Sequence, residues 1–209
     1  MDGYNTMKQH AIVGMASSAL VAALYLLMDV PLPAAFARVS FFLLFLTMII
    51  GPIVKLKQQG PVKSALMLPS TWRGELGIWF TFFGLMHVVI LAFDRPILSF
   101  IELGGGGYGL ANLLGLVALL WALVLSATSC SKAIRYLGVT SWKWVQSFAY
   151  LIFYLVSGHY IYFQFFSSNG GNPGPDWFGF VALGMILVVI LLEFVAFVAT
   201  VKKAKQPKK

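Results

Sequence analysis

The sequence predicts an all-α protein, a six-helix transmembrane bundle with both chain termini in the cytoplasm. Of its 209 residues, 59% are hydrophobic and only 11% are charged, and the mean hydropathy is +0.84. This apolar share is well above that of a typical soluble domain. A spanning helix needs about 20 mostly apolar residues, and six stretches of that kind follow one another along the chain. We therefore expect one membrane domain over residues 1–209.

Six apolar segments define the predicted helices, and they cover residues 10–28, 36–54, 76–93, 108–127, 144–166 and 177–200. The first has no convincing small-residue cleavage site, which favours a retained helix over a signal peptide. Turn-forming residues separate the first from the second, the third from the fourth, and the fifth from the sixth, in the stretches DVPLP, ELGGGGYG and SSNGGNPGPDW. Arg38 lies near the edge of the second segment, and Glu193 lies inside the sixth.

The basic residues predict the orientation of this bundle. In a six-span arrangement, 13 of the 15 Lys and Arg residues fall on one side, and only Arg38 and Arg95 fall on the other. Lys and Arg concentrate in cytoplasmic loops, so both termini are expected in the cytoplasm. The net charge of +8 is thereby explained by membrane orientation, and we expect membrane lipid and no nucleic acid as a partner.

Two of the three histidines lie inside predicted spans, where an ionisable side chain is costly and normally faces the bundle interior or a ligand. His87 lies six residues before Phe93, at the end of the third segment, and His159 lies seven before Phe166, at the end of the fifth. At about 1.5 Å per residue, each lies roughly 10 Å below the outer boundary. The third histidine, His10, starts the first segment, where water can solvate it.

Two histidines at one depth, on two helices that run in the same direction, suit the two faces of a flat cofactor such as haem. Gly84 lies about one turn before His87, and Gly158 directly precedes His159, so both could leave room for a macrocycle. The alternative is that each imidazole hydrogen-bonds to a neighbouring helix. Zinc is disfavoured, because no Cys, Asp or Glu at this level completes a tetrahedral set.

The segment RYLGVTSWKWVQSFAYLIFYLVSGHY resembles the ferric-reductase-like transmembrane domain family. Within that family it looks most similar to the haem-binding membrane subunits of periplasmic methionine-sulfoxide reductase systems. TMIIGPIVKL, WRGELGIWFTFFGLMHVV and LVLSATS agree with the family in order, and the resemblance covers about residues 40–166. It implies one haem b with His87 and His159 as iron ligands, in a protein of the bacterial inner membrane.

Gln146 departs from the family pattern, because it occupies the position of the family's first histidine in this segment. It lies thirteen residues, or about 20 Å, before His159, and glutamine is a poor iron ligand. Arg73 or Gly74 lies at the same level in the third segment, and neither ligates iron. The resemblance therefore puts an inner haem in doubt, and it implies that FMN or FAD could be held there by residues including Arg73 and Gln146. Glu193 is expected to pair with Arg73, Arg135 or Lys143.

The sequence therefore predicts a transmembrane electron-transfer protein. It would take electrons on the cytoplasmic side from a flavin, a flavoprotein or a quinol and pass them through haem b to an acceptor on the outer side. The chain has no nucleotide-binding fold, so an oxidoreductase of this type would need a separate reductase partner. The alternative is a cofactor-free membrane transporter or assembly partner with structural histidines.

Overall fold

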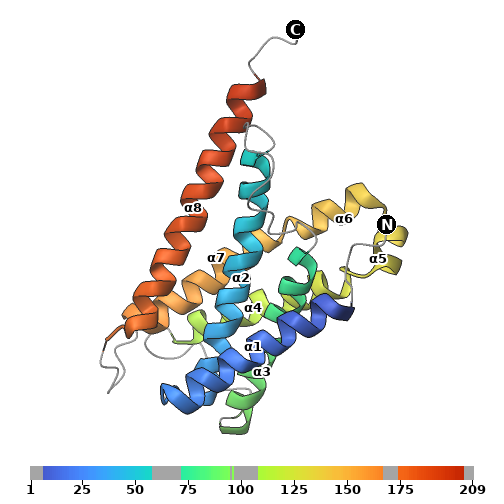
Figure 1. Ribbon diagram of the computed structural model, residues 1–209. Helices are drawn as coiled ribbons and strands as arrows, with labels where there is room; N and C mark the ends of the chain where they lie inside the picture. Colours follow the sequence, from blue (N-terminus) through green and yellow to red (C-terminus); the bar gives the residue numbers. More distant parts are fainter. Residues whose placement is uncertain (1–6, 58–71, 95, 97–107, 167–173, 205–209) are drawn as a thin grey trace.

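The computed structural model describes residues 7–57, 72–94, 96, 108–166 and 174–204. Within these residues the chain forms helices and no strand (Figure 1). In chain order the elements are α1 (Met7–Leu27), α2 (Leu32–Lys57), α3 (Arg73–Asp94), α4 (Tyr108–Ala127), α5 (Ser131–Leu137), α6 (Val139–Gln146), α7 (Ala149–Ile161), the π-helix η3 (Tyr162–Phe166) and α8 (Trp177–Ala204). Lys63, Arg95 and the basic residues from Lys205 onward lie outside the described residues.

Five of the six predicted spans are single long helices, namely α1, α2, α3, α4 and α8. Each is long and apolar enough to cross a membrane. Their bounds follow the hydrophobic pattern closely. Helix α2 extends beyond its predicted segment at both ends, and α8 extends beyond its segment at the C-terminal end. The chain is thus a multi-pass integral membrane protein.

The prediction of one continuous helix over residues 144–166 is wrong. A turn at Ser147 and Phe148 separates α6 from α7, and α7 passes directly into η3. The Ser147 hydroxyl donates a 2.6 Å hydrogen bond to the Trp144 carbonyl, and the Phe148 N–H bonds to the Val145 carbonyl, three residues back. A serine that bonds to nearby backbone competes with regular helix geometry. The path nevertheless continues in nearly the same direction (Figure 1).

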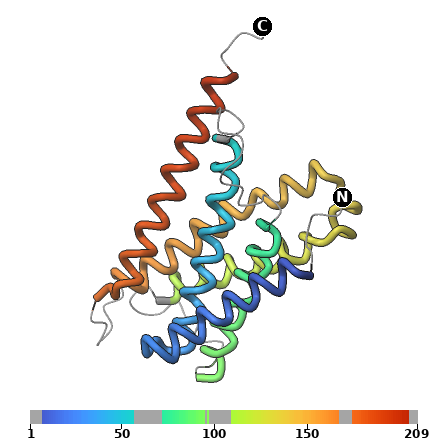
Figure 2. The backbone as a smooth tube through the Cα atoms, in the orientation of Figure 1, coloured from blue at the N-terminus to red at the C-terminus, as the bar shows by residue number. Residues whose placement is uncertain are grey.

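Helix α2 is the centre of the bundle. It contacts α1, α3, α7 and α8, and half of its apolar window is buried, against 22–28% for the other long helices. Figure 2 shows α8 running beside α2. Phe41, Leu44 and Met48 are fully buried within this contact region. On the far side of α2, α1 closes against α3, because a Cβ on Gly14 would come within 2.3 Å of the Trp79 ring.

An ion pair joins α2 to the start of α8. The Arg38 guanidinium donates to the Asp176 carboxylate, and it also lies 5.5 Å from the Trp177 ring centroid and 5.4 Å from that of Phe178. Asp176 also caps α8, since its Oδ1 accepts a 2.9 Å hydrogen bond from the Gly179 N–H. Arg38 is buried, so Asp176 compensates its charge while fixing where α8 begins.

Removing the charge of Asp176 should loosen the contact between α2 and α8. In Asp176→Asn the cap acceptor remains, and we expect the free energy of unfolding to fall by about 1.5–3 kcal/mol through loss of the charged hydrogen bond. Asp176→Ala also removes the cap and should cost about 1 kcal/mol more. Denaturant titration in detergent micelles measures both. Asp94→Asn, at the exposed end of α3, is the control, and an equal loss there would contradict the role of Asp176.

Candidate functional site

His87 is positioned by a hydrogen bond between α3 and α2. Its Nδ1 lies 2.9 Å from the backbone carbonyl oxygen of Pro33, in the first turn of α2. One turn deeper, a Cβ on Gly84 would lie 3.2 Å from the Ser40 hydroxyl, and that hydroxyl donates to the Phe80 carbonyl at 3.0 Å. Helices α2 and α3 are therefore held closely together at His87 and over the turns of α3 that precede it.

His159 is positioned in the same way by α4. Its Nδ1 lies 2.7 Å from the backbone carbonyl oxygen of Ala111, in the first turn of α4. The Phe163 ring, one turn further along the chain in η3, meets the imidazole edge to face at a centroid distance of 5.0 Å. The imidazole thus has a fixed partner on α4 and an aromatic neighbour on its own helix.

These two hydrogen bonds decide which nitrogen of each ring can bind a metal. A carbonyl oxygen only accepts, so Nδ1 of each imidazole carries the hydrogen and donates it. In the neutral ring the lone pair is then on Nε2. Metal-ligating histidines are usually held in this manner, with the second nitrogen donating to a carbonyl or carboxylate. Both side chains therefore have the tautomer that an Nε2 ligand requires.

Helix α4 shows that the two histidines lie at one level of the bundle. It is antiparallel to α3, because Thr81 contacts Ala122 while Gly84 faces Leu119. His87 lies three residues beyond Gly84, about 4.5 Å along the axis, and the same step along α4 from Leu119 reaches residue 116. Gly115, the neighbouring position, faces His159. The two imidazoles are near enough to interact electrostatically.

Glycine packing around His159 differs from the expected pattern. A Cβ on Gly115 would lie 2.8 Å from the imidazole Nδ1 and 2.9 Å from its Cε1, so Gly115 is the residue that admits the ring. A Cβ on Gly158 would lie at an ordinary 3.6 Å from Leu114 Cδ1. Gly115 was not predicted, because nothing in the residue pattern indicates that α4 packs directly against His159.

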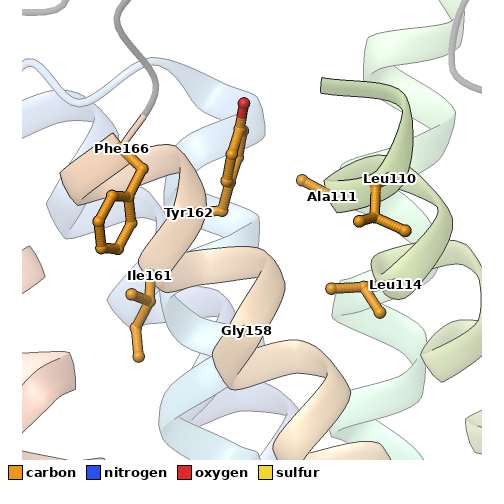
Figure 3. A pocket seen from close by; sticks show the side chains of 7 residues that line it. All are labelled: Leu110, Ala111, Leu114, Gly158, Ile161, Tyr162 and Phe166. Carbon is orange, nitrogen blue, oxygen red and sulfur yellow. The ribbon is translucent and has the colours of Figure 1, made fainter. Parts of the chain in front are cut away.

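A groove lies beside this level, between the first turns of α4 and the end of α7 with η3 (Figure 3). Its volume is about 290 Å³, and its lining is apolar except for the Tyr162 hydroxyl. Leu110 and Leu114 form one wall, and Ile161, Tyr162 and Phe166 form the other. Gly158 lies in this wall, so its lack of a side chain opens the groove.

Arg73 lies at the other end of the bundle, in a polar cluster that four helices share. A Cβ on Gly51 of α2 would lie 3.6 Å from Arg73 Nη1 and 3.7 Å from the Tyr150 hydroxyl of α7. That hydroxyl is a hydrogen-bond partner of Glu193 of α8. The expected pairing of Glu193 with Arg73, Arg135 or Lys143 is not found as an ion pair among the described residues; Tyr150 is its partner instead.

Gln146 has its side-chain amide engaged with the end of α4. Its Nε2 lies 3.2 Å from the Leu125 carbonyl and 3.3 Å from the hydroxyls of Thr128 and Ser129. Trp142 adds a 3.1 Å hydrogen bond from its indole N–H to the Thr128 carbonyl. The last carbonyls of a helix lack partners within it, so these side chains dock α6 onto α4. The described contacts join Arg73 to α2 and α7, and Gln146 to α4.

Glu75 is a buried acid that was not singled out from the sequence. It lies in the first turn of α3 and is 0% exposed, and neither carboxylate oxygen has a hydrogen-bond partner among the described residues. In the sequence, Glu75 is marked only by its position inside the stretch WRGELG, which agrees with the family pattern. No group of three or more His, Cys, Asp or Glu residues that could hold a metal occurs within the described part of the chain, so a metal at the histidine level would have two imidazole ligands.

Gly115→Ala should displace His159, whereas Gly158→Ala should not. The added methyl group at position 115 overlaps the imidazole, and overpacking of this kind typically costs about 1–3 kcal/mol of unfolding free energy. The methyl group at position 158 meets Leu114 at a normal contact distance. Denaturant titrations of both variants in micelles compare the two positions. Equal losses would show that Gly115 has no special relation to His159.

No protein-family model matches this chain, and no curated protein matches it either. The likeness to the ferric-reductase-like family therefore stays an expectation from sequence motifs. The fold and the histidine level rest on contacts within the chain itself.

Proposed function

We propose that the protein is a transmembrane electron carrier that binds haem b between His87 and His159. The observation that supports this proposal is the matched pair of hydrogen bonds from Nδ1 to a backbone carbonyl. Each leaves the Nε2 lone pair of an imidazole for iron, on different helices and at one level. The residues present thus fit the group that the sequence resemblance implies.

His87 and His159 would hold the haem through their Nε2 atoms, and Gly84 and Gly115 let the neighbouring helices approach closely. A haem held by two imidazoles would supply one-electron transfer and not oxygen binding. Pro33 and Ala111 fix the ring orientations through their carbonyls, and the groove beside this level is lined mainly by apolar side chains.

The direction of transfer follows from the basic residues. Lys143 lies in the last turn of α6, and Lys55, Lys57, Lys202 and Lys203 lie at the ends of α2 and α8, the same ends as the Arg73 cluster. Under the positive-inside rule this end faces the cytoplasm, as in a bacterial inner membrane. The histidine level then lies nearer the outer side, so electrons enter from a cytoplasmic flavin, flavoprotein or quinol and leave to an outer acceptor.

The competing interpretation uses the same contacts. A hydrogen bond from an imidazole to a neighbouring helix also holds α3 to α2 and α7 to α4, as it would in a cofactor-free transporter or assembly partner. Such bonds are worth only about 0.6–2 kcal/mol each within membranes. Haem binding therefore has to be measured directly.

Purified full-length protein should show a Soret band and a reduced-minus-oxidised spectrum of a low-spin haem b, with one haem per chain by pigment extraction. His87→Ala and His159→Ala should each lose the bound haem, because each removes an iron ligand. His10→Ala is the matched control, since His10 lies in the first turn of α1 and should leave the spectrum unchanged.

Two results would overturn the proposal. One is protein expressed with an adequate haem supply that carries no haem. The other is a Soret band that neither His87→Ala nor His159→Ala alters while both variants remain folded by circular dichroism.

A further inference from the structure

At the Arg73 end of the bundle, the side chains of Tyr150 and Glu193 meet, and one oxygen of Glu193 remains without a hydrogen-bond partner among the described residues. The Glu193 Oε1 atom is buried and has no hydrogen-bond partner among the described residues, although the carboxylate as a whole is a partner of the Tyr150 hydroxyl. An unpartnered acceptor is costly in apolar surroundings. An ionisable group inside a membrane span therefore suggests a ligand or a proton to bind.

The position of this cluster matters as much as its chemistry. Tyr150 lies nine residues before His159 on α7, about 13.5 Å along the helix axis. Gln146, where the family pattern would place a second iron ligand, lies on α6, beyond the turn that separates α6 from α7. Tyr150 shares α7 with His159, so a donor at the level of Tyr150 lies closer along the chain to the histidine level than one at Gln146.

A donor can approach this cluster along the exposed surface of α8, the helix that carries Glu193. Glu193 is partly exposed on the surface of the chain, and its neighbours Phe194 and Leu191 are 63% and 61% exposed. The cluster thus lies at an apolar surface and is not enclosed on all sides. Arg73 supplies positive charge near the Tyr150 hydroxyl, and Tyr154 is a further titratable group close to it.

We propose that Glu193, with Tyr150 and Arg73, forms the donor site of the protein, where Glu193 accepts a proton from a reduced two-electron carrier with acidic O–H or N–H groups. This inference rests on the proposed electron-transfer function. The carrier loses two electrons and two protons in all: two O–H or N–H bonds break, and the ring becomes the oxidised carrier. The electrons would leave one at a time to a haem held by His87 and His159, and each proton would pass to Glu193 and then to cytoplasmic water.

Hydroquinones and dihydroflavins share this chemistry, and the measurement can separate them. The rate of haem reduction is followed by stopped-flow absorption in full-length protein, with a water-soluble hydroquinone, with reduced FMN and with dithionite. Dithionite donates electrons without releasing a ring proton. Glu193→Gln preserves the size of the side chain but accepts no proton, so reduction by the true carrier should slow about 10²-fold or more, while the rate with dithionite stays unchanged.

Binding provides a second readout that does not depend on turnover. Calorimetric titration of the oxidised carrier should show weaker binding to Tyr150→Phe, because the hydroxyl that contacts Glu193 is lost. Glu75→Gln is the matched control, since it removes another buried carboxyl group at the same end of the bundle. It should alter neither the rate nor the binding.

The outcomes separate this inference from the proposal on which it rests. Absence of haem refutes the electron-transfer function itself. With haem bound, the inference is refuted if Glu193→Gln slows neither hydroquinone nor reduced FMN, if it slows dithionite equally, or if Glu75→Gln produces the same loss. Slowing with one carrier alone supports the inference and identifies that carrier.

Discussion

The structure depends on one constraint, that a polar group surrounded by apolar side chains and lipid must find its partner inside the bundle. The two intramembrane histidines meet this constraint through backbone carbonyls in the first turns of α2 and α4. These carbonyls lie at helix starts near the same end of the bundle, so both imidazoles are brought to one level. The hydrogen bonds that satisfy Nδ1 also leave Nε2 as the nitrogen with a lone pair.

The same constraint separates structural polar residues from candidate functional ones. Gln146 and Trp142 use their donors on the last carbonyls of α4, and Arg38 is matched by Asp176; each of these contacts joins two elements. Glu193 keeps one buried oxygen without a partner among the described residues, and Glu75 keeps both. Glu75 is fully enclosed, whereas Glu193 is partly exposed on the surface of α8, which is why Glu193 and not Glu75 is proposed as a binding group.

The helices were predictable wherever hydrophobic length alone decides. Five of the spans follow directly from apolar stretches of sufficient length. The interruption at Ser147 and Phe148 was missed, because the surrounding residues are as apolar as those of a continuous span, and a local serine hydrogen bond decides the geometry. The partner of Glu193 was also mispredicted. Opposite charge favoured a basic residue, but helix packing placed Tyr150 beside it.

The sequence by itself determined that this is an all-helical membrane protein and that His87 and His159 are the intramembrane imidazoles, because hydrophobic length and charge are properties of local composition. Only the tertiary structure decided which carbonyl orients each ring, that Gly115 admits His159, and that the Gln146 amide docks onto the end of α4. These features depend on contacts between helices far apart in the chain. Helical spacing fixes depth along each helix, but not which neighbour a side chain meets.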